Sequence, residues 1–349
     1  MKSDSILVDH AELERFIRDL LVARGASPAD ALTVAQGLVW ANLRGVDGHG
    51  VSRLPRYLQY LDRGDIDPKA QPRLVHDRAA TFVLDSGHGF GPPAVMQASA
   101  LAVARAKTSG VCFGLIREHT HSGAIGRYAQ WIAERGCAAV VMGAGPTLMA
   151  YHGARVASLS TSPIAMAVPS SNGPIVLDMA TSMISNGKIM QSRAAGTPLP
   201  EGAVLTAEGE ATIDPRRAEI LLPFGGAKGS GLAFMFEMLA SVLAGAPIQS
   251  RSLGPEKRNR NTGNTALLAV DIATFRVLAD FTDDADALVA LLKALPRQAG
   301  FDEIMMPGER ARRTDAKRRV SGIPIPAKLW EELGGIARTH AVTTMAAKG

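Results

Sequence analysis

The segment over residues 110–136 constrains the fold more than any other part of the chain. Residues 110–116, Gly-Val-Cys-Phe-Gly-Leu-Ile, form a short apolar run that predicts a buried β-strand. Apolar residues then recur at helical spacing from residue 124 to residue 133, and a glycine ends the run. A strand and a helix therefore follow one another closely, and the turn between them carries His119 and His121.

His121 is the first candidate functional residue. It follows the predicted strand, and Ser122 can serve as the N-cap of the next helix. The positive end of a helix dipole favours a nearby anion and disfavours a protonated imidazole. A neutral imidazole beside an anion-binding pocket is suited to proton transfer. His121 is thus a candidate proton shuttle, and the alternative is a half-buried histidine on a surface turn.

Length and charge narrow the class of protein. The 349 residues suffice for two domains or one large interleaved domain, and 46% hydrophobic with 20% charged residues is typical of globular proteins. The net charge of +5 is mild. The basic runs at 310–313 and 317–319 lack interleaved aromatic residues, so we expect no nucleic-acid partner. An anionic small substrate or cofactor accounts for the charge equally well.

Cysteine usage and apolar runs indicate a compartment. Cys112 and Cys137 are the only cysteines, and their apolar surroundings predict reduced thiols rather than a disulfide. The N-terminus lacks the apolar region of a signal peptide, and no apolar run is long enough to span a bilayer. We therefore expect a cytoplasmic protein without membrane association.

Periodicity and turn residues predict further elements. Helices are expected at residues 1–25 (with a capping box of Asp9 and Glu12), 28–43, 54–61, before 109, 232–243, 284–295 and 326–338. Strands are expected at 81–85, 137–143, 163–169, 174–178 and 267–272. The remaining stretches are expected to be a linker at 65–80, a helix from Asp178 to about Lys188, a surface excursion at 190–220 and a turn at 307–309.

The glycine-rich turn at residues 44–53 contains a second candidate pair. His49 and Arg53 are four residues apart, so they project from the same side if a helix has begun. Arg53 can hold a carboxylate through two nitrogens while His49 bonds the neighbouring oxygen. The alternatives are a turn-stabilising His49 and an ion pair of Arg53 with Asp62 or Asp65.

Three other stretches have features of nucleotide contact. A loop poor in polar residues surrounds Gly145, where a ligand can approach the backbone closely. Asp178 and Thr181 place an acid and a hydroxyl at a strand end, which suits ribose and phosphate groups. Lys228 lies between glycines at a helix start, as in an anion cradle. Simple helix capping and a solvated Lys228 are the alternatives.

Neither glycine-rich stretch is a standard nucleotide motif. At residues 87–93, Pro92 occupies a position where the dinucleotide fingerprint needs glycine. Lys228 is followed by Gly229 and lacks the spacing of a Walker A loop.

Taken in order, these motifs resemble the malate/L-lactate dehydrogenase family of the second type. That family includes ureidoglycolate, sulfolactate and 2,3-diketogulonate oxidoreductases and Δ1-piperideine-2-carboxylate reductases. The resemblance extends over roughly residues 8–335 and rests on Arg44-Gly45, His49-Gly50, Arg53, His121, Gly153-Ala154, Pro163, Asp178 to Ser182, Gly187-Lys188, Lys228-Gly229 and Pro307-Gly308.

The resemblance implies an architecture. It is an α/β (α+β-like) fold that is not a Rossmann fold, with a mostly antiparallel nucleotide-binding sheet and a helical layer built from both termini. Residues 1–70 with 300–345 would form a helical, dimerisation and substrate region, and residues 75–300 the NAD(P)-binding and catalytic region. The resemblance also implies a homodimer.

The resemblance implies a reaction as well. A nicotinamide cofactor, NAD or NADP, exchanges a hydride with C2 of a small 2-oxo or 2-hydroxy acid. By position, Arg53 and Gly48 contact the carboxylate substrate, His121 moves the proton and His49 orients the substrate, with the reverse histidine roles left open. The implied cofactor contacts are Gly145, Asp178, Met179, Ala180, Lys228, Gly308 and Glu309.

Departures from the family pattern leave the substrate open. Gly48 replaces a serine, Ser162 replaces an asparagine, and His119 is an additional histidine. The nearest alternative within the same class is a cyclic-imine reductase acting on Δ1-piperideine- or Δ1-pyrroline-2-carboxylate. The missing hydroxyl at position 48 also allows a cofactor-binding protein that has lost catalysis.

A metal-dependent hydrolase is the remote alternative. Four histidines, at positions 49, 119, 121 and 152, could surround a metal ion. No nearby acid completes a recognisable ligand set, so we expect no metal.

Overall fold

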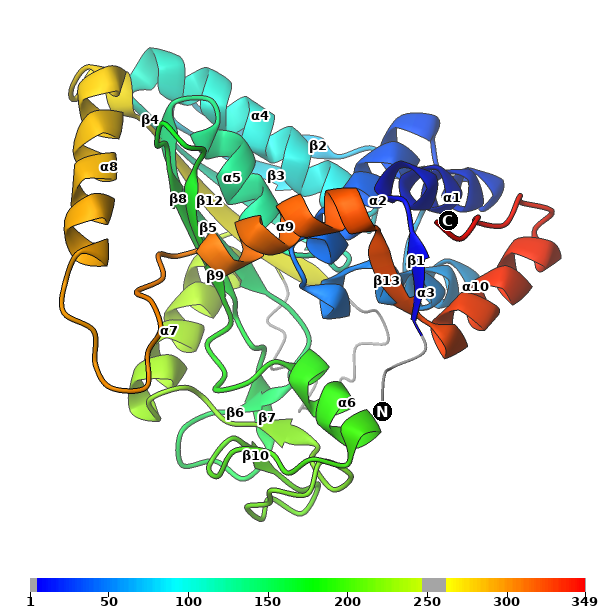
Figure 1. The fold of residues 1–349 in the computed structure, drawn as a ribbon. Helices are drawn as coiled ribbons and strands as arrows, with labels where there is room; N and C mark the ends of the chain where they lie inside the picture. Colours follow the sequence, from blue (N-terminus) through cyan, green and yellow to red (C-terminus); the bar gives the residue numbers. More distant parts are fainter. Residues whose placement is uncertain (1–4, 247–261, 349) are drawn as a thin grey trace.

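A seven-stranded sheet forms the centre of the molecule, as Figure 1 shows for a computed structural model that describes residues 5–246 and 262–348. Its strand order is β2-β3-β4-β12-β5-β8-β9. Only β3 and β4 pair in parallel, and the other five neighbouring pairs are antiparallel. The strands are β2 (Arg73–Asp77), β3 (Thr81–Asp85), β4 (Val111–His119), β5 (Cys137–Ala144), β8 (Ile164–Val168), β9 (Ile175–Met179) and β12 (Gly263–Asp271).

Helices cover both faces of this sheet. On one face, α4 (Gly91–Ser109) and α5 (Gly126–Ala133) bury alanines and Tyr128 against the strands. On the other face lie α7 (Ala227–Glu237) and its π-helical continuation (Met238–Val242). The fold is therefore α/β, as expected.

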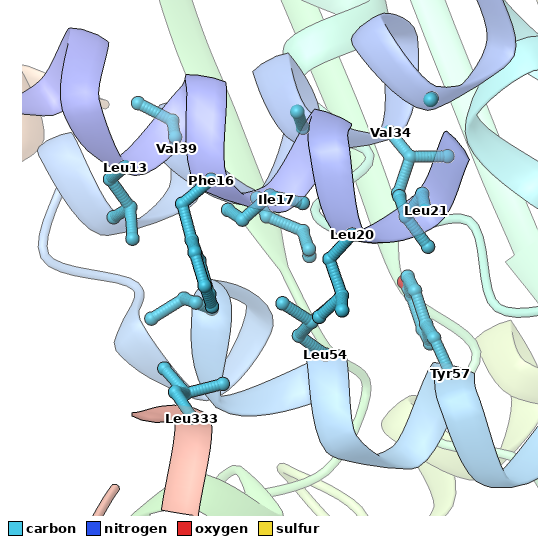
Figure 2. Close-up of a cluster of buried hydrophobic side chains, with 14 of the residues drawn as sticks. Leu13, Phe16, Ile17, Leu20, Leu21, Val34, Val39, Leu54, Tyr57 and Leu333 are labelled. Carbon is cyan, nitrogen blue, oxygen red and sulfur yellow. The ribbon is translucent and has the colours of Figure 1, made fainter. Parts of the chain in front are cut away.

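Segments from both ends of the chain form a second body beside the sheet. It contains α1 (His10–Ala23), α2 (Pro28–Leu43), α3 (Leu54–Asp62), α10 (Ala327–Thr339) and the antiparallel pair β1 (Ser5–Val8) and β13 (Ile323–Pro326). Figure 2 shows α1 side chains directed at Leu54 and Tyr57 of α3 and at Leu333 of α10. This shared core holds α3, and with it the His49 turn, in place.

The remaining elements lie at the periphery. A four-stranded sheet has the order β10-β11-β6-β7. Its strands are β6 (Met149–Ala150), β7 (Ala157–Leu159), β10 (Val204–Leu205) and β11 (Ile220–Leu221), and the outer helices are α6 (Asn186–Ala195), α8 (Leu278–Lys293) and α9 (Glu309–Ser321). In the described part of the chain, none of the helices is long and apolar enough to cross a membrane.

The expected first helix was wrong at its beginning but right at its end, where Arg24 is the C-cap. Residues 5–8 form β1, because they pair with β13 near the other end of the chain. Asp9 does cap α1, accepting a bond from the Ala11 amide at 2.9 Å. Glu12 instead binds Arg15 at 2.7 Å, so the reciprocal capping box is absent.

Two connecting segments also differ from expectation. The linker at 65–80 contains β2, which pairs with β3. No helix begins at Asp178. Instead, Ser185 caps α6 by accepting the Lys188 amide, so Gly187 and Lys188 lie in its first turn rather than at its end.

Helix α9 was not predicted, because it has no apolar stripe and buries no residue. It carries both basic runs. Ion pairs one turn apart, Arg313 with Glu309 and Arg319 with Asp315, stabilise it as such pairs do on exposed helices.

Candidate active site

The directions of the strands bring several loop segments together at one end of the central sheet, where strands begin and end. Gly263, where β12 begins, lies opposite His119 at the end of β4. Asn264 lies opposite Ala144 at the end of β5. Met179, at the end of β9, pairs with the first residue of β8. The C-terminal ends of β4, β5 and β9 therefore lie at the same end of the sheet as the start of β12.

Candidate residues that are far apart in sequence lie together at this end of the sheet. His121 follows β4, Gly145 follows β5, and Asp178 to Ala180 close β9. The side chain of Asp178 reaches toward α5 and accepts a bond from the Gly126 amide at 2.9 Å. The residues expected to move the proton and to contact the cofactor therefore lie in one region.

His49 and His121 face one another at this end of the sheet. Their rings are stacked, with centroids 5.5 Å apart and an interplanar angle of 15°. His49 ends a 3-10 turn that follows α2, whereas His121 belongs to the loop after β4. The helical body and the sheet thus each contribute one imidazole.

Tyr57 binds His121 from the side of the terminal helical body. Its ring is 2% exposed in the terminal core, and its hydroxyl lies 2.7 Å from His121 Nδ1. The Gly123 amide donates to the same nitrogen at 3.3 Å. Because Nδ1 is engaged, Nε2 is the nitrogen available to a ligand.

Arg53 supplies the positive charge of the site. Its Nε donates to the Gly48 carbonyl at 2.6 Å, which orients the guanidinium. Among the residues that the structure describes, Arg53 forms no ion pair, since Asp62 binds Arg24 and Asp65 binds Arg63. The alternative of an ion pair with either acid was therefore wrong, and the outer guanidinium nitrogens are available to an anion.

Burial and positive charge keep the two imidazoles neutral. Burial, with a smaller effect of Arg53, lowers the pKa of His49 to about 4. Burial, then Arg53, His49 and His119, holds the pKa of His121 well below its usual range. The predicted neutral His121 follows from these causes rather than from a helix dipole.

The expected helix cap at Ser122 was wrong. Helix α5 begins at Gly126 and its N-cap is Ile125, so Ser122 lies three positions before the cap. The Ser122 carbonyl instead accepts the Tyr128 hydroxyl at 2.5 Å. The first turn of α5 faces the carboxylate of Asp178, which accepts the Gly126 amide.

Of the other two histidines considered as metal ligands, only His119 has side-chain hydrogen bonds among the described residues. The Nδ1 atom of His119 bonds the Thr120 carbonyl at 2.5 Å, and its Nε2 bonds the Thr265 hydroxyl at 2.9 Å. His152 lies beside Gly226 at the start of α7. Within residues 5–246 and 262–348, no three histidine, cysteine, aspartate or glutamate side chains are grouped as metal ligands.

Lys228 lies close to the end of β9. The Phe224 amide donates to the Thr181 carbonyl at 2.9 Å, which docks the glycine turn before α7 on this segment. Lys228 is exposed in the first turn of α7, and no described acid pairs with it. Its position is compatible with the predicted anion cradle.

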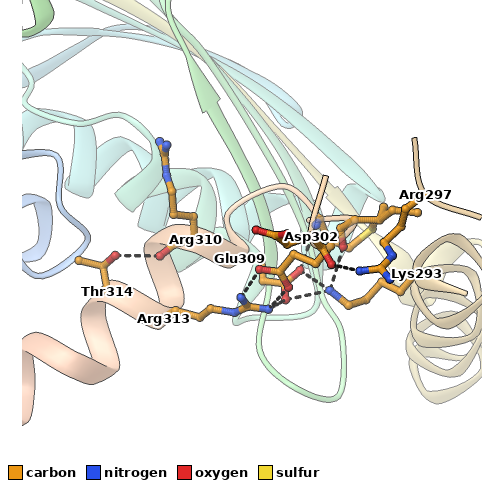
Figure 3. A network of polar contacts seen from close by, with 10 residues as sticks. Lys293, Arg297, Asp302, Glu309, Arg310, Arg313 and Thr314 are labelled. Carbon is orange, nitrogen blue, oxygen red and sulfur yellow. Dashed lines mark hydrogen bonds and ion pairs between the residues drawn. The ribbon is translucent and has the colours of Figure 1, made fainter. Parts of the chain in front are cut away.

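Gly308 and Glu309 lie at the start of α9, next to the middle and beginning of β9. A Cβ atom at Gly308 would approach the Val176 carbonyl to 2.6 Å, so only glycine allows this contact. Figure 3 shows Lys293 and Arg313 directed at Glu309, with nitrogen–oxygen distances of 2.7 and 2.5 Å. These cations, together with the Met306 amide, lower the pKa of Glu309 to about 2.

Two residues that support the site, Tyr57 and Asn42, were not predicted from the sequence. Tyr57 was recognised only as part of an apolar stripe, although it lies one helical turn after Arg53, a spacing that places both on one helix face. Asn42 gave no sequence signal because an isolated asparagine near a helix end is common. It is 2% exposed and binds both sides of the His49 turn.

Known proteins match this chain over nearly its whole length. The family model described as malate/L-lactate dehydrogenase matches residues 8–334. The chain belongs to the malate/L-lactate dehydrogenase family. The resemblance expected from the ordered motifs is thereby confirmed, and the protein is an oxidoreductase of CH–OH or C=N groups.

Relatives within the malate/L-lactate dehydrogenase family carry different names. A malate dehydrogenase of Pyrococcus abyssi is 32% identical over 95% of this chain and 94% of its own length. A Δ1-pyrroline-2-carboxylate/Δ1-piperideine-2-carboxylate reductase of Pseudomonas putida is 37% identical over 70% of this chain and 72% of its own. The crystal structure of malate dehydrogenase from Entamoeba histolytica, 25% identical, superposes with a TM-score of 0.93 over 97% of this chain and 99% of that chain.

We predict that Tyr57→Phe lowers kcat about tenfold, because one hydrogen bond that orients His121 is lost. The Michaelis constant of the carboxylate substrate should change little, since Arg53 is untouched. Tyr151→Phe is the matched control, because Tyr151 is 43% exposed. Steady-state kinetics of the three proteins measure the effect, and an unchanged kcat in Tyr57→Phe would show that this bond does not support catalysis.

We also predict that His49 stays neutral as the pH falls from 7 to 5, because its pKa is about 4 in the folded protein. Unfolding restores an ordinary pKa of about 6.5, so the unfolded chain takes up the proton first and the free energy of unfolding decreases as the pH falls below that value. Histidine ring NMR signals, assigned with His49→Ala, report the titration. A midpoint near 6.5 in the folded state would contradict the expected environment.

Proposed function

We propose that this protein transfers a hydride between a nicotinamide cofactor, NAD or NADP, and C2 of a small 2-hydroxy or 2-oxo acid. The observation that carries the proposal is the stacked pair of neutral imidazoles beside the guanidinium of Arg53, which forms no ion pair among the described residues. A carboxylate held at Arg53 places the neighbouring C2 oxygen within the region of the two rings.

In this proposal Arg53 holds the substrate carboxylate. Its outer nitrogens present a planar fork that lysine could not reproduce. The Nε bond to Gly48 fixes the direction of that fork before substrate arrives. Gly48 itself leaves the space beside Arg53 without a side chain, and its added Cβ would come within 3.6 Å of Gly187.

His121 acts as the proton shuttle and His49 as the orienting group. Tyr57 and Gly123 fix the ring of His121, so its Nε2 is directed to the C2 oxygen. The Gly123 amide can donate only to an unprotonated Nδ1, whereas the Tyr57 hydroxyl can also accept from a protonated Nδ1, so the Tyr57 bond persists when Nε2 takes up the proton. His49 lacks such a partner among the described side chains, which supports the assignment over its reverse.

The cofactor is proposed to bind along the outer edge of β9, the last strand of the sheet. When bound, nicotinamide supplies or accepts the hydride. The backbone of residues 178–180 and the Gly145 loop would contact it, Lys228 would neutralise its phosphates, and Gly308 with Glu309 would contact it at the start of α9. A cavity of about 200 Å³ beside Ile175, lined also by Asp286 and Glu309, lies at the far end of that edge.

A cyclic-imine reductase remains the alternative within the same site. The identity to the Pseudomonas putida reductase supports it, and Arg53 and His121 would serve a 2-imino acid in the same way.

The five antiparallel pairings fit a nucleotide-binding sheet that is not a Rossmann sheet. We further propose a cytoplasmic enzyme in which residues 1–70 with 300–345 form the substrate and dimerisation region and 75–300 the cofactor and catalytic region.

Oxidation of NADH or NADPH tests the proposal, with pyruvate, oxaloacetate, a ketogulonate, oxalurate and Δ1-piperideine-2-carboxylate as substrates. We expect turnover of at least one acceptor with one cofactor preferred. His121→Ala should reduce kcat by roughly 10²–10⁴-fold, the usual contribution of an acid–base group, with a smaller effect on substrate binding. Binding of both cofactors without turnover of any acceptor would favour a protein that has lost catalysis.

A homodimer is proposed from the family resemblance, and large apolar side chains exposed outside the terminal region offer a further contact surface. Examples are Met235 on α7 at 51% exposure, Leu243 just after the π-helical continuation at 59% and Leu291 on α8 at 69%. Exposed apolar clusters of this kind mark interaction surfaces. Sedimentation velocity at micromolar concentration should give twice the 36.7 kDa chain mass, and a single 36.7 kDa species would contradict the dimer.

A further inference from the structure

The turn that carries His49 and Arg53 is fastened by one buried amide. The side chain of Asn42, near the end of α2, donates from Nδ2 to Asp47 Oδ1 at 2.7 Å. Its Oδ1 accepts the Val51 amide, also at 2.7 Å. Asp47 and Val51 stand two residues before and two residues after His49. One amide therefore spans the turn on both sides of the imidazole.

The backbone of the turn is shaped around this amide. A Cβ atom at Gly50 would lie 2.3 Å from the Asn42 side chain, so any larger residue would expel the amide. The Ser52 hydroxyl donates to the Asp47 carbonyl at 2.7 Å and closes the turn a second time. The glycine at position 50 thus serves the packing of Asn42 rather than flexibility.

Arg318 of α9 completes the arrangement from the other end of the chain. Its two terminal nitrogens bind the two oxygens of Asp47 at 2.7 and 3.0 Å, a bidentate pair. One of them also donates to the main-chain carbonyl of Asn42. The Arg318 side chain is 16% exposed and that of Asp47 is 40% exposed, so only the arginine side of this pair is shielded from solvent.

We propose that Asn42, Asp47 and Arg318 form a positioning network that sets the geometry of His49 and Arg53. The inference rests on the proposed hydride-transfer function, because it assigns a role toward that same site. None of the three side chains is proposed to touch the substrate. They act through the turn, whose small displacement would move an orienting imidazole and the carboxylate-binding guanidinium together.

The test compares Arg318→Gln and Arg318→Lys with Arg319→Gln. Arg319 is the matched control, because it follows Arg318 on the same helix but pairs only with Asp315 of that helix among described residues. Kinetics would use NADH or NADPH with oxaloacetate or Δ1-piperideine-2-carboxylate, whichever the wild type reduces faster. Hydrogen exchange of the Val51 amide would be followed in every protein.

We expect Arg318→Gln to lower kcat/KM on the order of 100-fold, with kcat reduced and KM raised, since misplacement by about 1 Å has that cost. The lysine variant should recover part of the loss because it keeps the charge but not the fork. Val51 exchange should accelerate in both variants, while cofactor binding to the free protein stays unchanged. The control should match the wild type throughout.

Several outcomes would overturn the network. Wild-type kcat/KM in Arg318→Gln would do so, whatever the exchange result, because the turn would then not depend on Arg318 for function. Lower activity explained fully by a lower melting temperature, with unchanged Val51 exchange in the folded state, would show only a structural role. If Arg318→Gln does not fold, Arg318→Lys carries the same comparison.

Failure of the proposed function is distinguishable from failure of the network. If the wild type reduces none of the five acceptors named above, the function fails, and Val51 exchange still reports whether Arg318 holds the turn. If the wild type is active and Val51 exchange is the same in all proteins, the network fails while the function stands.

Discussion

The contact between Tyr57 and His121 joins the two bodies of this protein. The tyrosine ring belongs to the core shared by α1, α3 and α10, whereas the histidine belongs to a loop at one end of the central sheet. His49 and Arg53 come with the first body, and Asp178 with the second. The geometry of the site therefore depends on how the terminal helices dock on the sheet. A second contact, from the Arg127 guanidinium of α5 to the Thr33 carbonyl of α2 at 2.8 Å, supports the same docking.

The electrostatics of the site follow from this junction. Two imidazoles and a guanidinium meet where water is partly excluded, and in the described structure no carboxylate pairs with Arg53. Burial and like charge then keep both histidines neutral. An anionic ligand at Arg53 would offset the field that disfavours a protonated ring. Binding of a carboxylate and readiness of His121 to hold a proton are thus physically linked.

Close backbone contacts recur around the site, and each has a separate cause. Gly50 makes room for the amide of Asn42, Gly308 lets α9 approach the Val176 carbonyl, and Gly48 lies against Gly187. The first two positions are dictated by neighbours within the chain. The third faces the space beside Arg53, and it is where this chain departs from the serine expected for the family.

The sequence by itself determined the local elements whose signals are short-range. Helix α2, its proline start and its end near Leu43, the hairpin of β8 and β9, and strand β3 all follow from capping residues and apolar runs within one segment. The ordered motifs also sufficed to place the chain in its family. His49, Arg53 and His121 could be singled out because they lie on turns, where polar residues are not explained by packing.

Only the tertiary structure decided which of these residues meet. Strand β1 was missed because its partner, β13, lies at the other end of the chain, and α9 was missed because it has no buried face. The stacking of His49 on His121 and the contact of Tyr57 with His121 depend on docking between two bodies. The span of Asn42 from Asp47 to Val51 depends on the fold of a turn whose glycines permit many shapes. Sequence spacing carries no information on such contacts, since strand order and packing distance determine them.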